Sequence, residues 1–216
     1  MRLALFDLDN TLIDRADGFD SWATEFAVAY GLGVEVVPTL TELDQDGYRL
    51  RPEFFALVRE RFGLRAGVEE LWAYYRRTYP EHLRCRPAVL AALAGLRERG
   101  WRLGIVTNGL PDIQPAKIAR TGLDGYVDGY CVSGVEGVRK PDPEIFRRAA
   151  ARCGGALDGG WMVGDHPDQD IGGGRAAGLR TAWVQRPGRW PAWPGGPSPD
   201  ATVRDVVDAA ALLAAG

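Results

Sequence analysis

The amino-acid sequence predicts an α/β fold, a doubly wound parallel sheet with a helical insert. Short apolar runs alternate with helical patterns along residues 1–14 and 87–216, which is typical of repeated βα units. The segment between these two parts shows helical periodicity and no strand of comparable strength. Right-handed crossovers would then place helices on both faces of the sheet.

Apolar spacing places the elements in order along the chain. Residues 3–6 are four apolar positions in a row, as expected of a strand buried on both faces. Residues 15–86 carry apolar side chains at helical spacing, beginning with Phe19, Trp22 and Phe26, and predict a small helical bundle. Beyond residue 87, the expected strands are 101–106, 127–132, 161–163 and 181–185, and the expected helices are 88–99, 113–120, 144–152 and 170–177.

Two acidic residues, Asp7 and Asp9, directly follow the first strand. In open α/β sheets ligands bind outside the carboxyl ends of the strands, where paired acids can hold a cation or transfer a proton. The alternative is a solvated turn, because Asp is also a favoured turn and helix-capping residue.

Polar residues at the ends of later strands favour a functional site over a solvated turn. They are Thr107, Asn108 and Gly109 after strand 101–106, Lys140 after strand 127–132, and Asp165 with Asp170 after strand 161–163. A hydroxyl, an amide and flexible backbone are suited to holding an oxyanion, and Lys140 adds a fixed positive charge.

These four groups, in this order, resemble the motifs of the haloacid dehalogenase superfamily over most of the chain. The motifs are Asp7 to Thr11, Thr107 with Asn108, Lys140, and Gly164 with Asp165 and Asp170. The resemblance implies a Rossmann-like sheet of strand order 3-2-1-4-5, with residues 15–86 as a helical C1 cap hinged near Asp14 and Pro87. Dehalogenases of this superfamily lack an acid at the position of Asp9, so the phosphatase branch is favoured.

The resemblance also implies a role for each residue in phosphoryl transfer. Asp7 is the expected nucleophile and forms an aspartyl-phosphate, Asp9 exchanges the proton, and Lys140 balances the charge. Phosphate oxygens are expected to contact Thr107, Asn108 and Gly109. Mg²⁺ suits the hard oxygen ligands Asp7, Asp165 and the Asp9 carbonyl, while Asp170 either joins them or orients Lys140.

Composition agrees with a soluble metabolic enzyme. The 216 residues carry a net charge of −3, which gives no basic surface for nucleic acid. The three cysteines form no even framework, which favours reduced thiols. Without a signal-peptide pattern or an apolar stretch of membrane-spanning length, we expect a cytoplasmic monomer or homodimer that acts on a small phosphorylated metabolite and binds no membrane.

Several points stay open at the level of sequence. Gln114 and Lys117 follow the second motif, which looks like the branch of nucleotidases and N-acylneuraminate-9-phosphatases, but a solvated helix face would explain them equally well. Phe19 and Arg49 are candidates for substrate specificity in the cap. The Trp- and Pro-rich segment 187–199 is expected to be a loop. Alternative functions are a phosphoglucomutase-like isomerase that transfers phosphoryl groups and a non-catalytic binding protein on the same fold.

Overall fold

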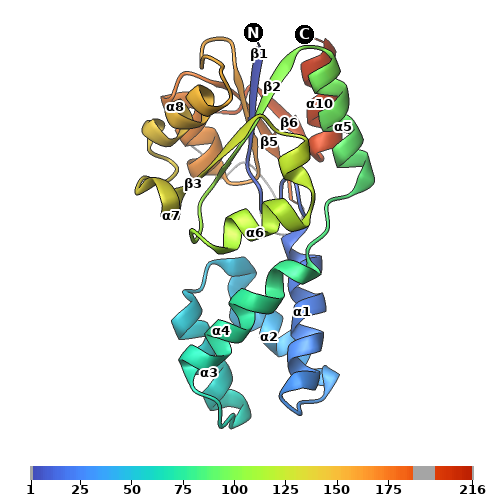
Figure 1. The fold of residues 1–216 in the computed structure, drawn as a ribbon, viewed down its shortest axis with the longest axis vertical. Helices are drawn as coiled ribbons and strands as arrows, with labels where there is room; N and C mark the ends of the chain where they lie inside the picture. The colour runs from blue at the N-terminus through green and yellow to red at the C-terminus, as the bar shows by residue number, and fades with distance from the viewer. Residues whose placement is uncertain (1, 187–197, 216) are drawn as a thin grey trace. The chain divides into compact units, whose positions relative to one another are not determined.

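The computed structural model describes residues 2–186 and 198–215. In it the chain forms two compact units (Figure 1). One unit consists of Met1–Ile13 and Cys85–Gly216, and the other of Asp14–Arg84. Residues 187–197 of the expected Trp- and Pro-rich loop lie outside the described residues.

The first unit contains a parallel sheet with strand order β3-β2-β1-β4-β5-β6. The expected order 3-2-1-4-5 is confirmed, and a sixth strand extends the edge beyond it. That strand has only three residues, too few to give a recognisable apolar run. The strands are β1 (Arg2–Phe6), β2 (Trp101–Thr107), β3 (Gly129–Val132), β4 (Trp161–Gly164), β5 (Arg180–Val184) and β6 (Ala201–Val203).

Strand β1 lies between β2 and β4 and is buried from Leu3 to Phe6. Its last residue, Phe6, is in register with Ile105 of β2 and Val163 of β4. The three strands therefore end side by side, and the residues that follow them meet at one edge of the sheet.

Helices cover both faces of this sheet (Figure 1). On one face α8 packs its apolar side chains, among them Ile145 and Phe146, against Leu3 and Leu5 of β1. On the other face α5 packs against α10. The helices are α5 (Pro87–Glu98), α6 (Ile113–Arg120), α7 (Ser133–Glu136), α8 (Pro143–Arg152), α9 (Gly173–Ala176) and α10 (Val206–Ala215), with a 3-10 turn at Leu123–Gly125.

The expected helix 170–177 differs from the structure. A π-helical turn, Pro167–Gly172, carries Asp170 and leads into the short helix α9. Three consecutive glycines at 172–174 favour this irregular backbone, because glycine in a helix interior is destabilising. Helices α7 and α10 were also not expected from the sequence.

The second unit is a helical bundle with an aromatic core. Within α1 the ring of Trp22 forms tilted pairs with Phe19 and Phe26. Edge-to-face pairs join Trp22 to Phe55 and Tyr75, and Phe19 to Phe54. The side chain of Asp14 begins α1 by accepting a hydrogen bond from the Asp17 N–H. The helices are α1 (Arg15–Ala29), α2 (Val37–Asp44), α3 (Arg51–Phe62) and α4 (Val68–Thr78), with 3-10 turns at Val34–Val36, Gln45–Gly47 and Tyr79–His82.

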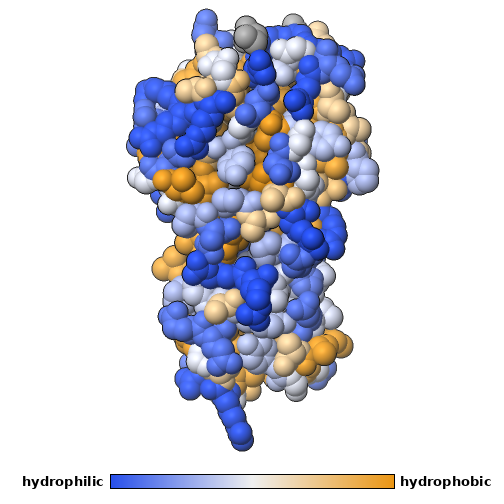
Figure 2. All heavy atoms as spheres, viewed as in Figure 1, coloured by the Kyte–Doolittle hydropathy of each residue, from blue (hydrophilic) through white to orange (hydrophobic). Residues whose placement is uncertain are grey.

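The surface seen in Figure 2 is mostly hydrophilic, interrupted by small apolar areas. This agrees with the burial of the large apolar side chains in the cores of the two units. No helix among the described residues is both long and apolar enough to cross a membrane.

Candidate active site

The ends of β1, β2 and β4 bring together the residues that the motifs predict. Asp7 directly follows β1 and its N–H donates to the Val163 carbonyl at 2.9 Å, which extends the pairing with β4. The chain then turns back sharply, with Asn10 in the left-handed region at φ 65° and its N–H bonded to the Ile13 carbonyl. Asparagine tolerates this conformation better than most residues, so the turn that carries Asp9 is encoded locally.

A buried ammonium group joins two of the predicted acids. Lys140 Nζ donates to Asp7 Oδ1 and to Asp170 Oδ1, both at 2.6 Å. Lys140 is 2% exposed and Asp170 1%, so the contacts are shielded from water. Of the two roles considered for Asp170, this geometry favours orienting Lys140.

Burial and like charge make this cluster electrostatically unusual. Burial raises the pKa of Asp7 to about 7, with Lys140 opposing the shift and Asp170 adding to it. Burial also raises the pKa of Asp165, and the neighbouring charges of Asp7 and Asp170 raise it further. Burial lowers the pKa of Lys140, but the carboxylates of Asp170 and Asp7 raise it more, so this side chain stays charged.

The carboxylates of Asp7, Asp165 and Asp170 fit a divalent cation. One oxygen of each lies within 4.8 Å of the others, and all three residues are buried. With Lys140 and Arg186, whose Nη1 lies 3.3 Å from Asp165 Oδ2, the five ionised groups would sum to a charge of −1. An all-oxygen, net negative donor set is what Mg²⁺ binds. The Asp9 carboxylate is outside this group, so the expected Asp9 ligand is its backbone carbonyl.

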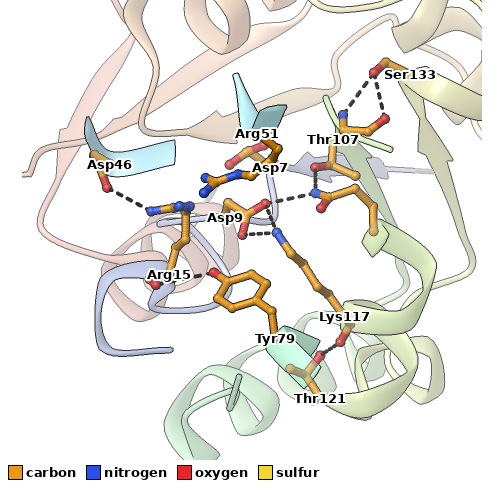
Figure 3. A network of polar contacts seen from close by, with 12 residues as sticks. Asp7, Asp9, Arg15, Asp46, Arg51, Tyr79, Thr107, Lys117, Thr121 and Ser133 are labelled. Atoms are coloured by element: carbon orange, nitrogen blue, oxygen red, sulfur yellow. Dashed lines mark hydrogen bonds and ion pairs between the residues drawn. The ribbon is translucent and has the colours of Figure 1, made fainter. Parts of the chain in front are cut away.

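The carboxylate of Asp9 has its own partners on α6 (Figure 3). Lys117 Nζ lies 2.8 Å from Asp9 Oδ1 and 2.7 Å from Oδ2, and Gln114 Nε2 donates to Oδ2 at 2.9 Å. Gln114 and Lys117 are 2% and 5% exposed, so the interpretation as a solvated helix face is wrong. In the sequence, these two residues are marked as site candidates by their spacing of three residues directly after the second motif.

The second motif is held in place by a side chain of α6 and by the backbone of Lys140. Gln114 Nε2 also donates to Thr107 Oγ1 at 2.6 Å. The Asn108 amide donates to the Lys140 carbonyl at 3.0 Å, and its oxygen accepts from the Lys140 N–H at 2.9 Å. Asn108 therefore fixes the backbone that presents Lys140.

The backbone of Gly109 has a partner within the protein. Its N–H donates to Ser133 Oγ at 3.0 Å, and its carbonyl accepts from the same hydroxyl at 3.4 Å (Figure 3). Thr107 and the Asn108 backbone remain the candidates for phosphate contact. What position 109 requires is the absence of a side chain, since a Cβ there would lie 2.5 Å from Gln114 Cγ.

The fourth motif shows why it begins with glycine. A Cβ at Gly164 would overlap the Asp170 carboxylate, which packs directly against this glycine. Asp170 Oδ2 accepts from the His166 N–H at 3.0 Å, while the His166 ring accepts from backbone N–H groups of the next turn. Arg186, which contacts Asp165, was missed, because its position after the expected strand 181–185 does not reveal this partner.

The specificity candidates belong to the helical unit and have partners within it. Phe19 is 1% exposed and packs against Trp22 and Phe54, which favours a role in the core of that unit. Arg49 Nε donates to the Leu43 carbonyl at 2.6 Å, and its Nη1 lies 3.5 Å from Glu53.

With this geometry established, comparison with known proteins identifies the family. The haloacid dehalogenase-like hydrolase family matches residues 1–178. The chain belongs to this family. The resemblance inferred from the four motifs is confirmed.

Relatives of this haloacid dehalogenase-like hydrolase include several phosphatases. A phosphoserine phosphatase of Thermus thermophilus is 42% identical over 61% of this chain, and the chain spans only half of that relative's length. A glyceraldehyde 3-phosphate phosphatase of Pyrococcus abyssi is 33% identical over 86% of this chain and 82% of its own. The crystal structure of a HAD phosphatase from Thermococcus onnurineus matches 99% of this chain and 98% of its own, with 27% identity and a TM-score of 0.65. The protein is therefore a phosphatase of this family.

Proposed function

We propose that the protein is a Mg²⁺-dependent phosphomonoesterase that cleaves a small phosphorylated metabolite through an aspartyl-phosphate. The observation that carries this proposal is the Lys140 ammonium group between Asp7 and Asp170, 2.6 Å from each, beside the carboxylate of Asp165. A nucleophilic carboxylate needs to be ionised and oriented while buried, and Lys140 supplies both conditions.

The first half-reaction transfers the phosphoryl group to Asp7. Lys140 holds Oδ1, so we assign the in-line attack on phosphorus to Oδ2. The Thr107 hydroxyl and the Asn108 backbone hold phosphoryl oxygens. As the bond from phosphorus to the leaving oxygen breaks, the protonated carboxyl of Asp9 gives that oxygen its proton, and the alcohol departs.

The second half-reaction releases phosphate. The Asp9 carboxylate now takes a proton from a water molecule, whose oxygen attacks the phosphorus of the aspartyl-phosphate. Phosphate leaves, Asp7 returns as a carboxylate, and Asp9 is protonated for the next cycle. Bound to Asp7, Asp165 and the Asp9 carbonyl, Mg²⁺ would neutralise charge on the carboxylates and the phosphoryl oxygens.

For the substrate we propose a nucleoside monophosphate or a sugar phosphate. The names of the relatives support a small molecule, since one is described as acting on phosphoserine and the other on glyceraldehyde 3-phosphate. We further propose that residues 15–86 act as a lid that closes over a leaving group of limited size. A cytoplasmic monomer or homodimer without nucleic-acid or membrane partners fits this role.

A phosphate-release screen tests the proposal. The purified protein is incubated with nucleoside monophosphates, sugar phosphates and a phosphopeptide, with either Mg²⁺ or EDTA. We expect phosphate from at least one metabolite, only with Mg²⁺, and loss of that activity in Asp7→Asn. Conversion of a sugar phosphate to an isomer without free phosphate would instead establish the isomerase, and activity in EDTA would contradict the metal assignment.

A further inference from the structure

The chain contains only two lysines, and both contact the acids of the first motif. Of its 26 basic residues other than histidine, 24 are arginine, and the lysines are Lys117 and Lys140. Lys140 Nζ contacts Asp7, and Lys117 Nζ contacts Asp9. Lysine presents a compact charge with three rotatable donors, whereas arginine presents a planar fork. A buried carboxylate that has to be approached from one narrow side suits lysine.

Lys117 fits Asp9 closely. Its Nζ lies 2.8 and 2.7 Å from the two carboxylate oxygens, and its side chain is 6% exposed against 21% for Asp9. The ammonium group therefore approaches from the protein side, while Asp9 keeps part of its surface open. Thr121, the C-cap residue of α6, donates its hydroxyl to the Lys117 carbonyl at 2.7 Å and fixes the helix end that carries this lysine.

Gln114 connects Asp9 to Thr107. A carboxylate only accepts hydrogen bonds, so the side of Gln114 that faces Asp9 has to be the NH₂ group. Its two hydrogens are directed to Asp9 Oδ2 at 2.9 Å and Thr107 Oγ1 at 2.6 Å. Because Thr107 accepts here, its own hydrogen points elsewhere and can donate to a phosphoryl oxygen.

Gly109 provides the space for this arrangement. A Cβ at position 109 would lie 2.5 Å from Gln114 Cγ and 2.7 Å from Cδ. A side chain there would displace Gln114 from both of its acceptors. The glycine of the second motif thus has a steric function toward Gln114.

We propose that Gln114 and Lys117 are positioning residues that hold the Asp9 carboxyl in line with the leaving oxygen and direct the Thr107 hydroxyl toward the phosphoryl group. This inference rests on the proposed function, because Asp9 is taken as the proton donor. In the proposed reaction neither residue contacts the phosphorus or the leaving oxygen, and each acts through Asp9 or Thr107. The pair therefore affects bond cleavage most when the leaving group depends on protonation.

The leaving-group dependence of kcat/KM tests the proposal. Alkyl phosphates need a proton donor, whereas p-nitrophenolate leaves with little help, and kcat/KM reports only the steps up to the aspartyl-phosphate. For Lys117→Met, which loses only the contact with Asp9, we expect kcat/KM to fall about 10²-fold on the best alkyl phosphate and clearly less on p-nitrophenyl phosphate. Gln114→Leu also releases Thr107, so it should lower kcat/KM on both substrates, and more on the alkyl phosphate. Lys117→Arg should recover part of the loss on the alkyl ester.

Two further variants separate positioning from general damage to α6. Gly109→Ala should give the same leaving-group pattern as Gln114→Leu, because both remove the glutamine contact. Arg120→Met removes an exposed charge from the same helix and should leave both substrates unchanged. Equal losses on the two substrates for Lys117→Met, or no loss in either Lys117→Met or Gln114→Leu, would overturn the positioning role.

A measurement without turnover separates this inference from the proposed function. With ¹⁵N-lysine labelling, NMR detects side-chain ammonium groups of only two lysines, and Lys117→Arg identifies the signal of Lys117. We expect that signal to shift in Asp9→Asn and in Gln114→Leu, but not in Arg120→Met. An unchanged signal in Asp9→Asn would refute the contact, even if the enzyme is active. A shifted signal in a protein that cleaves no phosphate ester would refute the proposed function instead.

Discussion

Replacing Lys140 by methionine removes the ammonium group between Asp7 and Asp170 and leaves an aliphatic side chain of similar length. Oxygens of the three carboxylates lie within 4.8 Å of one another, so each ionised pair repels by about 3.5 kcal/mol or more at an effective dielectric constant of about 20. Removing one partner of a buried ion pair costs about 3–5 kcal/mol of unfolding free energy. For a chain of 216 residues this corresponds to a Tm lower by about 6–20 °C.

The unfolding free energy that Lys140→Met loses should be larger at high pH than at low pH. Burial raises the pKa of Asp7 from 3.8 to about 7. The protonated form therefore contributes fully to the free energy of unfolding below pH 3.8, and this contribution is lost as the pH rises through about 7. Lys140 opposes this shift, so its removal raises the pKa of Asp7 further. At pH 5 a proton can replace the missing ammonium charge. At pH 8 the wild type ionises Asp7 beside Lys140, whereas the variant has no such partner.

Unfolding in EDTA at pH 5 and pH 8 measures this effect. We expect Lys140→Met to lose the full cost of breaking a buried ion pair, about 3–5 kcal/mol of unfolding free energy, at pH 8 and much less at pH 5. Arg148→Met removes a half-exposed arginine that pairs with Glu144 and with Glu136, and Glu136 keeps Arg152 as a partner. This variant provides the control and should show no such pH dependence. Equal destabilisation of Lys140→Met at both pH values would refute the account of a charge-coupled cluster.

Three other predictions concern the metal, the fourth motif and the helical unit. Adding Mg²⁺ to the wild type should raise Tm more at pH 8 than at pH 5, because the ligands Asp7 and Asp165 bind it deprotonated; equal shifts in differential scanning fluorimetry would contradict this. Gly164→Ala should displace Asp170 and weaken Mg²⁺ binding in calorimetry by at least tenfold, and unchanged affinity would remove the steric argument. Phe19→Ala should lower Tm by roughly 6–20 °C, because truncating a buried phenylalanine costs about 3–5 kcal/mol of unfolding free energy. An unchanged Tm with an altered ranking of substrates would instead favour a role of Phe19 in substrate specificity.

The sheet and the site at its edge could be predicted because both depend on local signals. Buried parallel strands are short apolar runs, and a polar residue directly after such a run is costly unless it has a purpose. Asp7, Thr107 and Asp165 each occupy such a position, and β1 lies between the strands that carry the other two. Their convergence follows from topology, which the resemblance supplied.

The remaining features depend on contacts that no local pattern encodes. Strand β6 is three residues long and is defined by pairing with β5. Arg186 follows β5 and contacts Asp165 across the sheet edge. Gln114 and Lys117 fit a solvated helix face as well as a buried one, because the helix period describes spacing and does not determine which neighbour covers a polar residue.

The two acids of the first motif are only two residues apart in the sequence, but they contact different partners in the structure. Asp7 lies in a cluster of three buried carboxylates, where Lys140 and a cation would balance the charge. Asp9 lies outside that cluster and is held by Lys117 and Gln114. A cation bound by the first group would leave the carboxylate of Asp9 with its own partners, and in the proposed reaction the same residue type acts as nucleophile at one position and exchanges a proton at the other. The separation comes from Gln114 and Lys117 on α6 and from Lys140 in the turn before α8, which is why Asp7 and Asp9 alone, read as a pair in the sequence, do not reveal it.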